Sequence, residues 1–219
     1  MRYQKRLAMP KTWPLPKKGK NTYVLSPIGK KKTEAISLII ILRDLLKISK
    51  TRKEAEKILR NKDILIDDKV IKDCKFPVGL LDMISIPKLN KYYKLTLKNN
   101  KLNLDEISEK DSHEKICKVI GKKQISEKEM QINLFGGKNL IYNGKVSVND
   151  SILLDLKQNK IIKIYPLKEG AKALILFGKH SNERGEIKKI IRDEKVQEAV
   201  LLTKHGEIKI PIKNIFVFD

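Results

Sequence analysis

The chain has 219 residues, of which 41% are apolar, so it can fill the cores of one large domain or several small ones and is not a disordered tail. Its 48 Lys and Arg residues outnumber its 26 Asp and Glu residues, which leaves a formal charge of +22 that repels itself unless a polyanion neutralises it. No apolar run is longer than that from Leu38 to Leu42, which is far shorter than the roughly 20 residues of a membrane-spanning helix and excludes an integral membrane protein of that type.

Most of the positive charge comes from lysine, since only seven of the basic residues are arginines. Lysine ammonium groups act as point charges towards phosphates, which favours binding to a nucleic-acid backbone over reading of base edges. Lys-rich surfaces also occur in proteins of AT-rich or heat-adapted organisms, so charge alone does not select the partner. The polar, proline-bearing N-terminus has no apolar signal-peptide region, and we expect a cytoplasmic protein.

The cysteines and histidines give no sign of a metal site. Cys74 and Cys117 are far apart and form no CxxC pair. His113, His180 and His205 lack the paired spacing of zinc ligands. We therefore expect two small core cysteines, no metal and no cofactor.

The N-terminal segment is basic and rich in proline. Residues 1–33 contain ten Lys or Arg residues, four prolines and two glycines, but no acidic residue. Such a segment cannot build a core alone, and we predict that residues 1–34 form an extension that folds against RNA. Trp13 either stacks on a base or packs onto the neighbouring domain, and its proline neighbours favour packing. The predicted RNA contacts of the extension are Lys5, Arg6, Lys11, Trp13, Lys17, Lys18, Lys20, Lys30, Lys31 and Lys32.

Residues 35–90 are predicted to form an α/β unit that begins with two helices. Apolar residues recur at helical spacing from Ala35 to Leu46, which predicts an amphipathic helix that ends near Ile48. The sequence 51–54, Thr-Arg-Lys-Glu, has the capping-box pattern and predicts a short second helix through Arg60.

Strands follow these helices. Residues 64–66 and 70–71 flank the polar turn 67–69, which predicts a tight hairpin, and residues 83–86 read as another strand. From residue 91 to 168 the pattern is almost wholly β, and we predict a small central barrel or sandwich. Its hairpin turns are expected at Asn99-Asn100, at Asn143-Gly144 leading into residues 146–148, and at residues 157–159.

Residues 169–219 are predicted to form an SH3-like barrel, because about fifty residues of short strands enclose one basic loop bounded by glycines at 178 and 185. The whole chain is thus predicted to be a multidomain α+β protein that is mainly β. The expected strands of this last module are residues 173–176, 186–191, 199–203, 208–210 and 215–218.

The unit from Thr51 to Val70 resembles the S4 RNA-binding domain, in which a Ser/Thr-Arg-x-Glu-Ala helix precedes a Val-x-Val-Asn-Gly-Lys hairpin. In that family the start of the helix and the hairpin form a groove for structured RNA, and the positive end of a helix suits phosphates. Asp67-Asp68 replaces the Asn-Gly of the family turn. The alternative is an ordinary helix pair with solvated lysines. The resemblance implies RNA contacts at Arg52, Lys53, Lys57, Arg60, Lys62 and Lys69, and we add Arg43 of the first helix.

The C-terminal loop resembles the KOW motif of translation and transcription proteins. Glycines are needed where such a loop takes positive φ or lets a phosphate backbone come close. His180 either contacts RNA or has no role. The positions that match the motif are Gly170, Gly178, Lys179, Arg184 and Gly185, of which the three glycines are predicted to be structural and Lys179 and Arg184 to bind RNA.

Residues 5–13, Lys-Arg-Leu-Ala-Met-Pro-Lys-Thr-Trp, are similar to the N-terminal Lys-Arg-Leu-Ala-Ala-Pro-Lys-x-Trp signature of the archaeal and eukaryotic S4e family of small-subunit ribosomal proteins. Residues 76–86 are similar to the Tyr-Pro-x-Gly-x-Met-Asp-Val-Ile-x-Ile of that family. The likeness covers essentially the whole chain, although residues 133–139 lack the expected His-Asp-Gly-Arg-like segment. It implies a structural protein that binds small-subunit ribosomal RNA through phosphates beside neighbouring ribosomal proteins, with no enzymatic activity and no small-molecule substrate.

Two alternatives stay open. An RNA-modifying enzyme with an S4-like domain, such as some pseudouridine synthases, would need a large catalytic domain, and no catalytic loop or cofactor turn is recognisable. A KOW-bearing factor that cycles on and off its target would need a partner surface, and the sequence singles out none.

Overall fold

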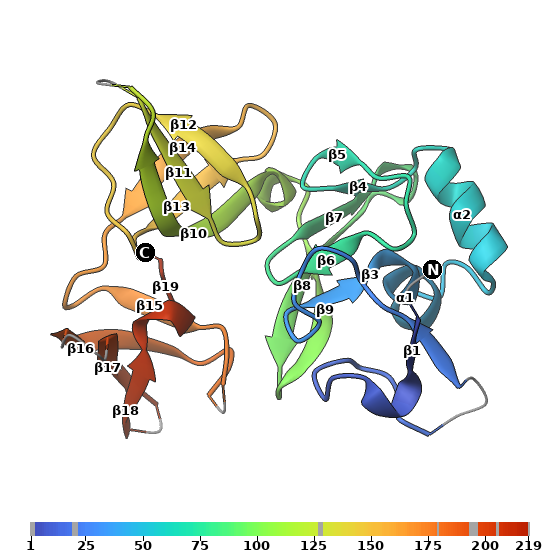
Figure 1. Ribbon diagram of the computed structural model, residues 1–219, viewed down its shortest axis with the longest axis horizontal. Helices are drawn as coiled ribbons and strands as arrows, with labels where there is room; N and C mark the ends of the chain where they lie inside the picture. The colour runs from blue at the N-terminus through green and yellow to red at the C-terminus, as the bar shows by residue number, and fades with distance from the viewer. Residues whose placement is uncertain are drawn as a thin grey trace. The chain divides into compact units, whose positions relative to one another are not determined.

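The computed structural model describes residues 3–18, 22–126, 129–178, 180–192, 197–204 and 206–218. The chain forms two compact units, Met1–His113 and Glu114–Asp219, and both are built mainly from short antiparallel strands (Figure 1). The predicted mainly β fold is confirmed. No helix in the described ranges is long and apolar enough to cross a membrane.

The first unit contains one five-stranded sheet, of order β5-β4-β7-β8-β9, and two two-stranded ribbons, β1-β2 and β3-β6. Its strands are β1 (Tyr3–Lys5), β2 (Tyr23–Leu25), β3 (Ala35–Ser37), β4 (Leu65–Ile66), β5 (Lys69–Val70), β6 (Pro77–Gly79), β7 (Met83–Ile86), β8 (Lys91–Lys98) and β9 (Lys101–Ile107). Its helical segments are η1 (Arg6–Ala8), α1 (Leu38–Ile40), η2 (Ile41–Leu45), α2 (Arg52–Arg60), η3 (Pro87–Leu89) and η4 (Lys110–His113).

Strand pairing continues across residue 90, where we expected one domain to end. β8 pairs with β7 in register from Met83 opposite Lys94 to Ile86 opposite Lys91. The strands that we expected together in a central β module therefore belong to two different sheets, since β8 and β9 join the sheet of the first unit. The division into four modules stays a prediction.

The N-terminal extension is packed onto the first unit. Trp13 is 1% exposed, and its Nε1 donates to the carbonyl oxygens of Lys32 at 2.8 Å and Ala35 at 3.1 Å. The backbone amide of Leu102 donates to the carbonyl of Thr12 at 2.7 Å, which ties the extension to β9. The extension is thus folded on the protein itself through Trp13 and its backbone, while Tyr3, Leu7 and Tyr23 stay exposed. Its contact with RNA stays a prediction.

The first predicted helix is much shorter than expected. Residues 35–37 form β3, and α1 and η2 together cover only residues 38–45. The side chains of residues 38–42 are all at most 2% exposed, so the segment is buried all round and is not amphipathic. An uninterrupted run of five apolar residues suits such a fully buried position. Periodicity alone does not distinguish a buried strand from a buried helical segment in so short a run.

The second helix and the hairpin after it are confirmed. Thr51 Oγ1 accepts the amide of Glu54, while the Glu54 carboxylate accepts the amide of Thr51, so the capping box is complete. Asp67 and Asp68 take positive φ of 49° and 59°, as a two-residue turn between β4 and β5 requires. The Asp67 side chain also accepts the amide of Met83 at 3.0 Å, which fixes the turn to the sheet.

The second unit contains two five-stranded sheets, of order β12-β11-β10-β13-β14 and β18-β17-β16-β15-β19. Their strands are β10 (Glu114–Gln124), β11 (Met130–Leu134), β12 (Asn139–Tyr142), β13 (Ser151–Asp155), β14 (Lys160–Tyr165), β15 (Lys172–Ile175), β16 (Arg184–Arg192), β17 (Gln197–Thr203), β18 (Gly206–Pro211) and β19 (Ile215–Val217), with the short helix η5 (Ile212–Asn214) before the last. His205, between the predicted strands 199–203 and 208–210, lies outside the described residues.

One predicted hairpin of the second unit is wrong. Residues 146–148 form no strand, and β12 pairs with β11 before Asn143-Gly144. Gly144 does not take positive φ, whereas Gly136 and Gly137, between β11 and β12, have φ of 97° and 87°. β12 therefore forms its hairpin with β11 through the turn at Gly136-Gly137, and not with residues 146–148 through Asn143-Gly144.

Lys118 is a buried cation that joins the two sheets of the second unit. It lies on β10, is 3% exposed, and donates to the carbonyl oxygens of Ile212 and Ile215, the latter at 2.9 Å. Its Nζ is 5.9 Å from the centre of the Phe216 ring. Burial lowers the pKa of the Lys118 ammonium from 10.5 to about 8.

Replacing Lys118 with methionine should change how stability depends on pH. Because the pKa is lower in the folded than in the unfolded protein, the unfolded chain binds more protons between about pH 8 and 10.5. The free energy of unfolding of the unmodified protein should therefore rise relative to that of Lys118→Met across this window, by up to about 3 kcal/mol. Urea unfolding at several pH values measures this, and parallel pH curves for the two proteins would contradict it.

Candidate RNA-binding surface

Three basic side chains form an exposed stripe on α2. Lys53, Lys57 and Arg60 stand at helical spacing on the side away from Ala55 and Leu59, which are buried. All three are exposed, and none forms an ion pair with a described residue. Their charge is therefore available to a phosphate group.

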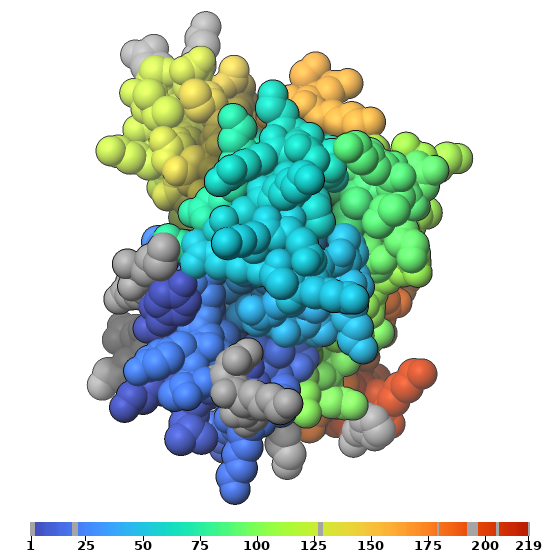
Figure 2. Space-filling view, turned by 90° about the vertical axis from the view of Figure 1, so that its right-hand side faces the viewer, coloured from blue at the N-terminus to red at the C-terminus, as the bar shows by residue number. Residues whose placement is uncertain are grey.

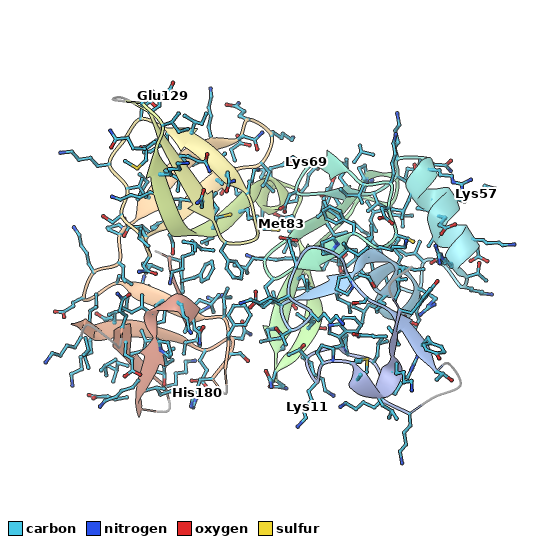
Figure 3. The ribbon with its side chains drawn as sticks, in the orientation of Figure 1. Lys11, Lys57, Lys69, Met83, Glu129 and His180 are labelled. Atoms are coloured by element: carbon cyan, nitrogen blue, oxygen red, sulfur yellow. The ribbon has the colours of Figure 1, made fainter. Side chains whose placement is uncertain are left out.

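The predicted groove continues from α2 to the β4–β5 hairpin. Lys62 follows α2 and Lys69 begins β5, and both side chains are exposed. Figure 3 shows Lys57 and Lys69 well apart on different parts of the first unit, so the predicted contacts do not form one compact cluster. These cations are spread from the helix to the hairpin, and such a spread suits the row of phosphates along a nucleic-acid backbone better than a single anion.

The N-terminus of α2 is less open to phosphate than the sequence suggested. Two of the first free amides are held by the Thr51 hydroxyl and the Glu54 carboxylate of the capping box. The backbone amides of Lys50 and Thr51 also hold the pKa of Glu54 below its usual value, so this carboxylate is charged at neutral pH. An anion at this helix end would meet a carboxylate, and the side-chain stripe is the better phosphate site.

Two of the predicted arginine contacts already have partners inside the protein. The Arg52 Nε donates to Glu56 at 2.7 Å, and its Nη1 donates to the Tyr3 hydroxyl at 2.7 Å. Arg43 makes a two-point contact with Asp44, at 2.8 and 3.2 Å. These pairs neutralise much of the charge of both guanidinium groups.

Some of the predicted RNA contacts of the extension are held by bonds within the protein, and the others are exposed. Arg6 donates to the carbonyl of Pro16 at 3.0 Å, Trp13 is buried, and Lys30 pairs with the buried Asp82 at 2.7 Å. Trp13 in this position has no free face for a base. Lys20 lies outside the described residues. The exposed lysines of the extension are Lys5, Lys11, Lys17, Lys18, Lys31 and Lys32, of which Lys31 has a 3.6 Å contact with Glu34.

In the C-terminal loop the glycines have clear structural roles. Gly170 and Gly178 take φ of 80° and 108°, and a Cβ on Gly185 would lie 2.6 Å from the carbonyl oxygen of Leu202 on β17. Gly178 and Gly170 thus allow turns that other residues adopt rarely, and Gly185 allows close strand packing.

The polar residues of this loop are only partly available. His180 Nδ1 lies 3.2 Å from a carboxylate oxygen of Glu183, a partner that the sequence did not suggest. Arg184 is exposed and lies over the Phe218 ring, 5.5 Å from its centre. Lys179 lies outside the described residues. The loop thus presents one exposed cation, Arg184, among its described residues predicted to bind RNA.

Sequence reasoning missed basic residues of the C-terminal sheet. Lys189 on β16 and Lys209 on β18 both stand opposite Val200 of β17, so the two lysines share one face of the sheet. Both side chains are exposed. The alternation of isoleucine and lysine in residues 208–210 indicates a strand with Lys209 on its exposed face.

The described residues contain no group of three His, Cys, Asp or Glu side chains that could hold a metal ion. The surface consists of separate cations on strands and one helix. Its chemistry is the attraction of anions.

Comparison with known proteins decides the family. The chain is 36% identical to the small ribosomal subunit protein eS4 of Methanosphaera stadtmanae, over 99% of this chain and 91% of that protein. The chain belongs to the S4e family of ribosomal proteins. The eS4 protein of Archaeoglobus fulgidus is also 36% identical, over 94% of this S4e chain and 86% of its own length. The whole-chain resemblance predicted from the sequence is thus confirmed.

Two further comparisons agree with membership of the S4e family. The family model described as "Ribosomal family S4e" matches residues 89–161. The crystal structure of the 30S ribosomal protein S4e from Thermoplasma acidophilum superposes with a TM-score of 0.72 at 27% identity, covering 84% of this chain and 95% of that one. The match of the family model spans part of each compact unit.

The structural and the exposed lysines of this S4e chain should respond differently to substitution. Lys30→Met leaves the buried Asp82 carboxylate without its ammonium partner and should lower the free energy of unfolding by about 2–3 kcal/mol. Lys57→Met, on the exposed stripe, should change it by less than about 0.5 kcal/mol. Chemical denaturation of both variants measures this, and equal effects would show that the Lys30–Asp82 pair is not structural.

Proposed function

We propose that this chain is a structural constituent of the small ribosomal subunit and binds ribosomal RNA through phosphate contacts that support subunit assembly and translation. Its partners are small-subunit ribosomal RNA and neighbouring ribosomal proteins, in the cytoplasm. The proposal includes no reaction, no membrane and no small-molecule substrate. The name of its relatives, small ribosomal subunit protein eS4, supports the assignment to the subunit.

The observation that carries the RNA contacts is the exposed stripe of α2 with the two lysines that follow it. Lys53, Lys57 and Arg60 share one side of the helix and have no ion pair among the described residues. A cation without an internal partner can neutralise a phosphate and so release the counterions that are condensed on the RNA. Since these side chains are point charges or flexible donors on a rigid helix, they fit a structured RNA backbone without selecting a base.

The module assignment is part of the proposal. We infer an S4-like RNA-binding domain over residues 35–90, supported by the capping box of α2 and the two-residue β4–β5 hairpin. The central β domain covers residues 91–168. An SH3-like KOW barrel covers residues 169–219, supported by a sheet in which β15 pairs with both β16 and the last strand, β19, around an apolar core of its own.

The alternative is a KOW-bearing factor that binds its target only transiently. A subunit constituent should sediment with small ribosomal subunits in equimolar amount and stay with them through a high-salt wash. A cycling factor should be removed by the same wash. Loss of the chain from washed subunits would therefore contradict the proposal, and a modified nucleoside after incubation of pure protein with RNA transcripts would contradict the non-enzymatic assignment.

Removing the charge of the α2 stripe should weaken RNA binding. The triple variant Lys53→Gln, Lys57→Gln, Arg60→Gln removes three phosphate contacts and should lower affinity for small-subunit ribosomal RNA at least about tenfold at moderate salt. The matched control is Lys122→Gln, Lys123→Gln, Lys160→Gln, which removes the same charge from exposed positions of the second unit. Filter binding measures both, and equal losses would show that total charge, and not the stripe, determines affinity.

A further inference from the structure

The β1–β2 ribbon exposes two tyrosine side chains. Tyr3 is 46% exposed and Tyr23 is 61% exposed, in contrast to Trp13 of the same extension, which is buried. Register places Tyr3 opposite Leu25 and Lys5 opposite Tyr23, so both tyrosines and Lys5 belong to one face of the ribbon. On such a face the two rings are diagonal neighbours, close enough to contact one ligand.

Two basic side chains, Lys5 and Arg52, lie at this tyrosine face. Lys5 is exposed directly across the ribbon from Tyr23. Arg52 Nη1 donates to the Tyr3 hydroxyl at 2.7 Å, which links the face to the first turn of α2. In Figure 2 the N-terminal segment, in blue, and the cyan region that contains α2 are exposed on the same side of the first unit.

The carboxylates next to this face are already occupied. Glu56 accepts Arg52 Nε at 2.7 Å, and Glu54 accepts the amides of Lys50 and Thr51 at 2.7 and 3.3 Å. Neither carboxylate is therefore free to neutralise Lys5. The face combines flat aromatic surface with the exposed ammonium group of Lys5, which is the combination that binds single-stranded nucleic acid.

We propose that the tyrosine face, formed by Tyr3, Tyr23 and Lys5, binds an unpaired RNA nucleotide, with the base stacked on Tyr23 and its phosphate beside Lys5. The inference rests on the proposed RNA-binding function and names a ligand class that phosphate contacts alone do not specify. Bases inside a duplex are stacked on each other and offer no free face, so the ligand is a loop, bulge or single strand. The hydrogen bond from Arg52 fixes the Tyr3 ring on the same face as Tyr23.

The test compares two RNA probes with the full-length chain. The probes are a fluorescent 12-nucleotide oligouridine and a 12-base-pair RNA duplex, and fluorescence anisotropy measures their affinities. Tyr23→Ala should weaken binding of the oligouridine about tenfold, because stacking on one aromatic residue is lost, and should leave duplex binding unchanged. Tyr23→Phe, which keeps the ring, should bind both probes like the unmodified protein.

Two controls separate stacking from other roles of the face. Tyr23→Leu keeps apolar volume but lacks a flat ring, so it should behave like Tyr23→Ala. Leu7→Ala removes another apolar side chain of the extension, 69% exposed, and should leave both affinities unchanged. Circular dichroism of every variant establishes that each is folded.

Three outcomes would overturn the proposal. If Tyr23→Ala binds oligouridine normally while the α2 triple variant loses affinity, the chain binds RNA but the tyrosine face does not stack a base. If Tyr23→Leu binds normally, or Leu7→Ala is as weak as Tyr23→Ala, the affinity for oligouridine does not depend on stacking against the ring of Tyr23. If the unmodified chain binds neither probe, the proposed RNA-binding function fails together with this inference.

Discussion

The carboxylates of this chain are few, and the fold uses several of them inside itself. Asp82, which is 2% exposed, accepts the amide of Gly79 at 2.6 Å and the ammonium of Lys30 at 2.7 Å. Asp150 accepts the amides of Ser147 and Leu167 at 2.9 and 3.0 Å. Each of these carboxylates is held by backbone amides inside the fold, so neither is available to the exposed lysines of the surface.

This use of charge divides the cations of the chain into those held inside the fold and those exposed on its surface. Lys30 and Lys118 are both held by acceptors of the protein, one by a carboxylate and the other by backbone carbonyl oxygens. Lys57 and Lys69 lie exposed on a helix and on a hairpin, where nothing in the described chain pairs with them. A polyanion that binds the exposed lysines would neutralise the positive charge that the carboxylates of the protein do not.

Local rules predicted some of the fold correctly. The capping box at Thr51, the hairpin at Asp67 and the turn at Asn99 each depend on a few neighbouring residues, and all are present in the structure. Tertiary packing decided the rest. The segment 38–42 is fully buried, so its apolar run does not belong to an amphipathic helix. The strand before Asn143-Gly144 is already paired with β11 through the turn at residues 136 and 137.

The site was predicted only in part for a similar reason. Sequence shows which residues are basic but not which of them a distant carboxylate will neutralise, and Asp82 is 52 residues away from Lys30. Burial of Trp13 likewise depends on carbonyl groups of residues 32 and 35, which the chain brings back to it. The exposed tyrosines of the β1–β2 ribbon became distinguishable from this tryptophan once the packing of the extension was known.

The central claim is that uncompensated surface cations of this chain bind the phosphate backbone of ribosomal RNA. The most direct measurement is the affinity for small-subunit ribosomal RNA as a function of salt concentration. Each neutralised phosphate should contribute about −0.7 to −0.9 to the slope of log K against log salt, so several contacts should give a steep decline. An affinity that stays flat between low and moderate ionic strength would contradict the account.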